Sequence, residues 1–157
     1  MKRRIIAVAV VALLAFCGSA SAATFTPHVL CGASCGTLAA SSGDGTLRMT
    51  ATGTTYGNIG SGRIAIKDLD GGHDFQVTGT GLRTWKDDGF TYFSGRNLFY
   101  FVTSSWAIKI HGTSGITSST TASGHGFIQG SGRWSRNRHA AVSWPSAGAT
   151  FALSATS

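Results

Sequence analysis

The chain has 157 residues, of which 13 are Lys or Arg and six are acidic, all six being Asp. Its length fits one domain and excludes a large multidomain protein. The 22 Gly residues, the many Ser and Thr, and the lack of Glu exclude a mainly helical protein. Glu and Lys are the usual surface residues of helices, whereas this composition favours turns and strands.

The first 22 residues have the three parts of a secretory signal peptide. Residues 2–4 are basic, residues 5–17 are apolar, and Ala20-Ser21-Ala22 matches the A-x-A cleavage pattern. The apolar run is shorter than the roughly 20 residues that span a bilayer, so no transmembrane segment is expected after cleavage. We expect residues 1–22 to be removed and residues 23–157 to form a single secreted or envelope-associated domain. Cys17 leaves open a lipoprotein, although Phe16 departs from the small residue of a lipobox.

Removal of that leader leaves ten Lys and Arg against six Asp, a net charge of +4. A moderate positive charge favours anionic partners such as acidic glycans or cell-wall polymers. Solubility alone is the alternative explanation. No nucleic acid partner is expected for an exported chain of this charge.

The remaining two cysteines, Cys31 and Cys35, are predicted to form a disulfide in an oxidising compartment. A metal or redox site is the weaker alternative, because His28 is the only other ligand type nearby.

Apolar and polar residues alternate along most of the chain, as in half-buried strands, and residues 47–51 and 106–110 show this most clearly. Turn sequences such as Gly60-Ser61-Gly62, Asp70-Gly71-Gly72 and Gly130-Ser131-Gly132 separate the segments about every ten residues. These features predict an all-β fold, an antiparallel β-sandwich or barrel of many short strands. Because residues 59–63 resemble residues 128–133, a β-solenoid is the second choice.

Residues 98–102 are apolar on both faces of a strand. This favours a central strand covered on both sides, or a strand whose second face meets a partner. Self-association through a face around Phe99 and Phe101 is one such arrangement.

One block resembles a motif of Gly-rich secreted β-proteins of actinobacteria. The motif is similar to Tyr-x-Gly-Arg-x-Leu-x-Phe, and the corresponding block here is Tyr-Phe-Ser-Gly-Arg-Asn-Leu-Phe at residues 92–99, followed by a Gly-punctuated strand at residues 108–112. The resemblance covers residues 60–133. It implies export and β-structure, and it implies no activity.

Asp68, Asp70 and Asp74 lie close together, with Gly71 and Gly72 between them. Such a run could offer oxygen ligands to Ca²⁺, although a polar hairpin turn explains the same residues. No other cofactor is expected. The carboxylates also support an alternative function, a hydrolase of wall or extracellular polymer, but the G-x-S-x-G and H-E-x-x-H motifs are absent from the sequence.

Arg and Trp are concentrated near the C-terminus, where Trp134, Arg136, Arg138 and Trp144 occur within eleven residues. Arg binds carboxylate or phosphate in a bidentate manner, and Trp offers a flat face for a sugar. A solvated loop with both Trp side chains packed inward is the alternative. The sequence therefore predicts a non-catalytic binding or structural module of the cell envelope or extracellular space, with these four residues as its ligand site for an anionic glycan.

Overall fold

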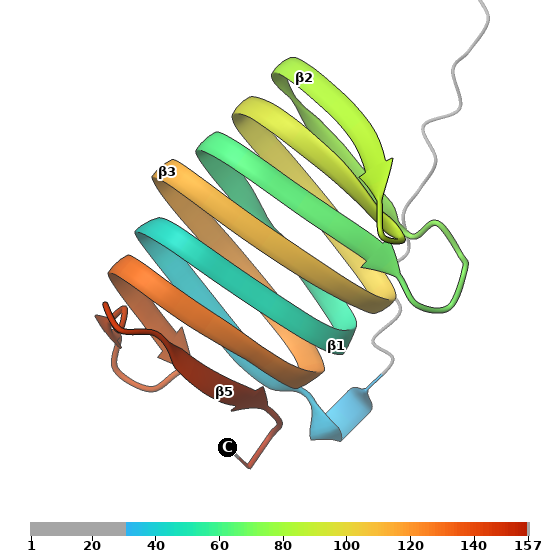
Figure 1. Cartoon of the computed structure of the whole chain (residues 1–157). Coiled ribbons are helices and arrows are strands. Elements are labelled where there is room, and N and C mark those ends of the chain that lie inside the picture. Colours follow the sequence, from blue (N-terminus) through green and yellow to red (C-terminus); the bar gives the residue numbers. More distant parts are fainter. Residues whose placement is uncertain (1–30, 157) are drawn as a thin grey trace, which may run out of the picture.

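The structure, a computed structural model, describes residues 31–156 as one antiparallel β assembly (Figure 1). The predicted signal peptide and lipobox lie outside these residues. The elements are η1 (Gly32–Ser34), β1 (Gly36–Asp68), β2 (Phe75–Asp87), β3 (Phe90–Arg136), β4 (Val142–Ser143) and β5 (Ala149–Leu153). β3 lies between β1 and β2, and it also pairs with β4 and β5. The predicted Cys31–Cys35 disulfide is confirmed, with the two Cα atoms 5.3 Å apart.

β1 and β3 are unusually long, and they wind together as two antiparallel ribbons (Figure 1). Leu47 of β1 pairs with Ile110 on one side and with Ile128 on the other, 18 positions further along β3. Each ribbon therefore crosses the molecule, turns a corner and returns on the opposite side. The result is two packed layers. We call the layer nearest the viewer in Figure 1 the front layer and the other the back layer.

The all-β, antiparallel prediction is confirmed, and the two layers correspond to the predicted sandwich. The strands are fewer and longer than expected. The Gly60-Ser61-Gly62 and Gly130-Ser131-Gly132 sequences lie within β1 and β3 and are not hairpin turns. Glycine lets a strand turn a corner while its neighbours keep pairing: Gly53 and Gly62 have φ values of +143° and +149°, which residues with a side chain rarely adopt.

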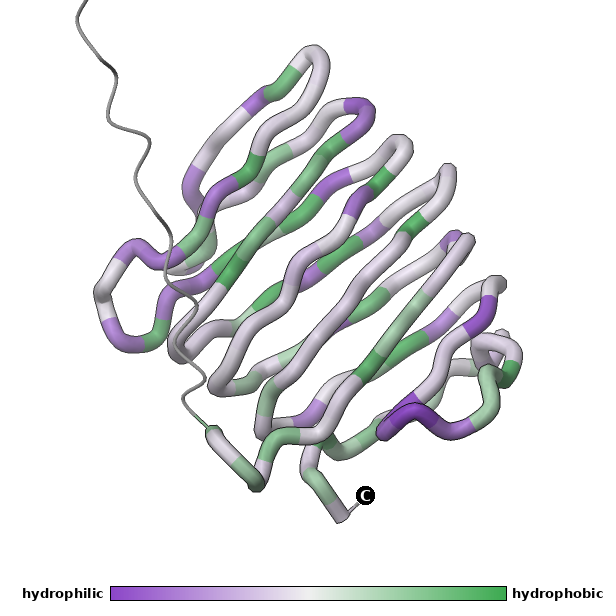
Figure 2. Tube along the Cα trace, turned by 180° about the vertical axis from the view of Figure 1, so that it is seen from behind, coloured by the Kyte–Doolittle hydropathy of each residue, from purple (hydrophilic) through white to green (hydrophobic). Residues whose placement is uncertain are grey.

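Inward-facing side chains form the core between the layers, and they line up from strand to strand. One such row runs across four neighbouring passes of β1 and β3, and its members are at most 1% exposed: Ile128, Leu47, Ile110 and Ile64. The green segments of Figure 2 show these hydrophobic positions recurring along the wound chain. The alternation seen in the sequence thus places one set of residues inside and the other set on two outer faces.

The two ends of the series of neighbouring strands differ. At one end Trp144 is 4% exposed and lies over Gly43, where an added Cβ would come within 2.1 Å of the indole ring. At the other end β2 pairs with β3 alone, and most of its residues are exposed. In the described residues no helix is long and apolar enough to cross a membrane.

Candidate functional site

The four residues of the predicted Arg and Trp site do not share one open surface. Trp144 belongs to the core, and its Nε1 donates to the carbonyl of Arg133 at 3.1 Å. Trp134 is half-buried against Phe151, with ring centres 5.4 Å apart. Arg136 lies 5.7 Å from the Trp134 ring, so those two residues are brought together, while Arg138 is exposed. The inward packing of Trp144 leaves its faces unavailable to a sugar.

The Asp-rich segment forms a turn between β1 and β2, so the turn is confirmed, but the hairpin is wrong because β3 lies between these two strands and they do not pair. Asp68 accepts hydrogen bonds from the backbone N–H groups of Asp70 at 3.0 Å, Gly71 at 2.8 Å and His73 at 2.5 Å. Asp70 accepts from the Ser104 hydroxyl and from the Ser105 N–H. These carboxylate oxygens close the loop. Among the described residues no group of three or more His, Cys, Asp or Glu side chains could hold a metal ion.

The acidity of Asp68 follows from the same contacts. Burial of this side chain, which is 12% exposed, raises its pKa, but the hydrogen bonds from His73, Asp70 and Gly71 together outweigh that effect and lower the pKa to about 2. The proton donor of a glycosidase needs a raised pKa. Asp68 is instead held as a carboxylate, which suits a structural role in the turn.

Tyr100 is the other strongly perturbed group, and it lies inside the sandwich. Burial raises the pKa of Tyr100 to about 12, against the opposing influence of Ser118 and Thr55. Those two hydroxyls lie nearby, but neither is placed to form a hydrogen bond with the phenol. A fully buried phenol with this pKa stays protonated and out of reach of a substrate.

The front face carries a different cluster, built from β1 and β3. Arg48 of β1 stands directly opposite Lys109 of β3, and Arg63 of β1 stands directly opposite His111. All four side chains are exposed. Because Lys109 and His111 are two positions apart on one strand, they point outward side by side. We call this cluster and its aromatic walls, described next, the basic groove.

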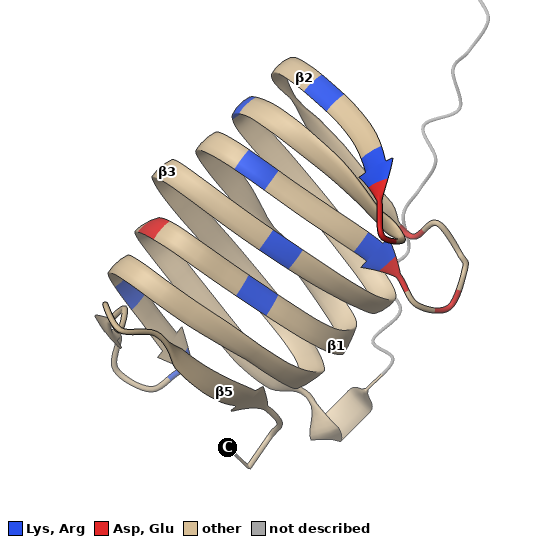
Figure 3. Ribbon diagram, in the orientation of Figure 1, with Lys and Arg blue, Asp and Glu red and all other residues tan. Residues whose placement is uncertain are grey.

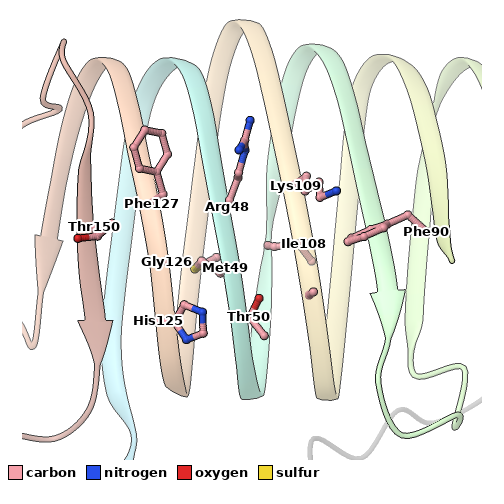
Figure 4. A pocket seen from close by; sticks show the side chains of 11 residues that line it. Arg48, Met49, Thr50, Phe90, Ile108, Lys109, His125, Gly126, Phe127 and Thr150 are labelled. Carbon is pink, nitrogen blue, oxygen red and sulfur yellow. The ribbon is translucent and has the colours of Figure 1, made fainter. Parts of the chain in front are cut away.

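Aromatic rings border these cations on both sides. Phe127 lies across from Arg48, whose guanidinium carbon is 6.0 Å from the ring centre. On the other side the ammonium of Lys109 lies 3.9 Å from the centre of Phe90. Beyond it Trp85 and Tyr92 stack with ring centres 5.2 Å apart. Figure 4 shows Arg48 and Lys109 between Phe127 and Phe90.

The face is hollowed at these residues. One depression, of about 260 Å³, is lined by Arg48, Lys109, Phe90 and Phe127. A second, of about 410 Å³, is lined by Arg48, Lys109 and residues on the far side of the cluster: Arg63, His111, Tyr92, Trp85 and Asp87. Since Arg48 and Lys109 line both, the two depressions adjoin each other across the strands.

Charge on this face is strongly one-sided. Figure 3 shows Lys and Arg in the middle of the front layer, and Asp at one corner, at the end of β1, in the loop after it and at the end of β2. Within residues 31–156 none of Arg48, Arg63 and Lys109 lies within ion-pair distance of a carboxylate; the contact within that distance joins His73 Nδ1 and Asp68, at 3.6 Å, in the loop after β1. Asp87 is the acidic residue among those that line the second depression.

Sequence reasoning missed this groove because its members are far apart in the chain. Arg48 and Lys109 are separated by 61 positions, and in the sequence each is an ordinary outward-facing polar residue between two apolar residues of a strand. The register between β1 and β3 brings them together. The one available signal was the recurrence of a basic residue at the centre of several predicted strands.

No protein-family model, curated protein or solved structure matches this chain. The chemistry of the groove is therefore the basis for its functional assignment.

Proposed function

We propose that the protein is a non-catalytic binding module of the extracellular space or cell envelope, and that it binds an anionic glycan in the basic groove. The observation that carries this proposal is the pair of like charges, Arg48 opposite Lys109, with Arg63 and His111 beside them. Like charges directly opposite each other destabilise a sheet by up to about 1 kcal/mol. A bound anion removes that repulsion.

The aromatic walls narrow the class of anion. A small anion such as phosphate needs no flat rings, whereas a sugar chain presents apolar C–H faces that stack on them. Six residues follow one another in register across neighbouring strands: Trp85, Tyr92, Ala65, Lys109, Arg48 and Phe127. With strands about 4.8 Å apart, five strand spacings give a site roughly 24 Å long. This length suits several sugar units of an acidic polysaccharide.

Co-sedimentation with purified cell-wall sacculi, at about 50 mM and about 500 mM salt, tests the proposal. Contacts between exposed cations and an anionic polymer are screened as salt rises, so we expect binding at low salt and much weaker binding at high salt. Sacculi from which the anionic polymers have been extracted are the control, and they should bind little protein. Equal binding to both preparations, or no binding at low salt, would contradict the proposal.

A further inference from the structure

The back face carries three aromatic side chains that the sandwich does not bury. Tyr56 of β1 is 48% exposed, Phe99 of β3 is 40% exposed, and Phe101 is half-buried. Tyr56 stands directly opposite Phe101, and Asn58 stands directly opposite Phe99. Both arrangements expected for residues 98–102 place one face in the core, and Leu98, Tyr100 and Val102 fill it; Phe99 lies on the outer face and is 40% exposed, so among the described residues that face is not fully covered.

The side chains around these rings are polar and uncharged. Their immediate neighbours across the strands are Asn58, Gln76, Thr78, Thr117 and Ser119. None of these is Lys, Arg, Asp or Glu. The front face differs, because Lys and Arg residues lie in its middle (Figure 3). Figure 2 views the molecule from this side. We call Tyr56, Phe99 and Phe101, with these five neighbours, the neutral platform.

Exposed aromatic side chains grouped on one face usually mark an interaction site, because apolar surface left in water gains nothing from burial, and here Tyr56 and Phe99 are the exposed ones. The strands do not need aromatic residues at these outward-facing positions. Thr or Ser would preserve the alternation of buried and exposed residues, and Thr54 and Ser119 do so nearby. The rings therefore point to a ligand on this face.

We propose that the neutral platform is a second binding site, and that its ligand is an uncharged polysaccharide chain. Sugar rings offer C–H faces to aromatic rings and hydroxyl groups to the amides of Asn58 and Gln76 and the hydroxyl of Thr78. A charged polymer would find no opposite charge there. Because this surface lies on the layer opposite the basic groove, one molecule can hold a neutral and an acidic chain at the same time.

Sedimentation with insoluble cellulose, chitin and curdlan at about 500 mM salt tests this site apart from the basic groove, because electrostatic binding is screened at that salt. The full mature protein should bind at least one of these polymers. The double variant Tyr56→Ala/Phe99→Ala should bind at least about tenfold more weakly. The control variant Leu82→Ala/Val142→Ala removes two exposed apolar side chains elsewhere and should bind as the parent does.

Circular dichroism of both variants checks that the fold is kept. Absence of binding to all three polymers overturns the proposal, as does equal weakening in the two variants. A concentration-dependent dimer in analytical ultracentrifugation that Tyr56→Ala/Phe99→Ala abolishes would also overturn it, because a second copy would then cover the platform. Each of these results leaves the sacculus experiment unaffected, so failure here is distinguishable from failure of the anionic-glycan proposal.

Discussion

Arg48 and Lys109 share a strand register that a sheet selected for stability alone would avoid, because their charges repel across the pair. Their contacts with Phe127 and Phe90 offset part of that cost. Both side chains nevertheless remain exposed at the centre of a concave surface. At the scale of single residues, this arrangement supports the proposal of a ligand that supplies negative charge.

Asp68 illustrates the opposite case, a charged residue whose function is local. Its Oδ1 accepts the N–H groups of Asp70 and Gly71, and its Oδ2 accepts that of His73. In Asp68→Asn one oxygen becomes an amide donor, so at least one of these bonds is lost. We expect the variant to lose about 1–2 kcal/mol of unfolding free energy at neutral pH, a figure that allows for solvent screening at this loop.

The pH dependence follows from the direction of the shift. Because folding lowers the pKa of Asp68 from 3.8 to about 2, the stabilisation is present above pH 3.8 and is lost as the pH falls toward 2. Denaturant unfolding between pH 5 and 2 should show a shallower loss of stability in Asp68→Asn than in the parent. Asp88→Asn, in the turn after β2, is the control and should follow the parent. Parallel pH curves for Asp68→Asn and the parent would contradict this account.

At the scale of the elements, the corners of β1 and β3 depend on glycine in two ways. Gly53 has a φ of +143°, and an added Cβ would lie 2.4 Å from the Thr121 carbonyl oxygen on the neighbouring pass of β3. A side chain here would strain the backbone and separate two paired strands. The same corner also places the carbonyl that accepts the Trp106 indole N–H at 2.9 Å.

Gly53→Ala should therefore destabilise the protein by about 3 kcal/mol or more, since strain and a backbone clash add together. Gly115→Ala is the matched control: its φ of +60° is also positive, but nothing lies within 4 Å of the added Cβ. We expect it to cost about 1 kcal/mol. Thermal and urea unfolding of the two variants measure the difference, and equal destabilisation would show that the close approach at Gly53 does not matter.

The alternation of residues such as Leu47, Met49 and Ala51 was enough to predict strands, their buried faces and the sandwich class. The winding could not be predicted, because a Gly at a corner and a Gly in a hairpin satisfy the same local rule. Local rules therefore predict hairpin turns at Gly62 and at Asp70-Gly71-Gly72: the first lies within β1, and the second is a turn between β1 and β2, which do not pair with each other. A Gly in the local sequence predicts a bend in the chain. Whether the strand also ends at that bend depends on the strands with which it pairs.

The site was harder to predict for the same reason. Trp134 and Arg136 are neighbours in sequence and remain neighbours in space, so their grouping was visible in advance. Arg48, Lys109 and Tyr92 share one face only through the register of four neighbouring strand passes, with Ala65 between Tyr92 and Lys109. A surface assembled in this way has no local sequence signature.

At the scale of the whole molecule, the sandwich separates two kinds of surface chemistry. The front layer presents cations with aromatic rings, and the back layer presents rings with uncharged polar groups. The wound strands hold each set in fixed rows, so neither surface needs to fold on binding. This architecture suits a module that binds extended polymers without chemical change.

The most direct measurement is binding of three proteins to anionic cell-wall sacculi at about 50 mM salt: the parent, Arg48→Ala/Lys109→Ala, and Arg136→Ala/Arg138→Ala. Both variants lose two positive charges, but only the first alters the basic groove. We expect Arg48→Ala/Lys109→Ala to lose at least about tenfold in affinity, or roughly 1.4 kcal/mol, and Arg136→Ala/Arg138→Ala to bind within about twofold of the parent. Equal losses would show that net charge, not the groove, drives binding, and a loss confined to Arg136→Ala/Arg138→Ala would place the site at the C-terminal segment.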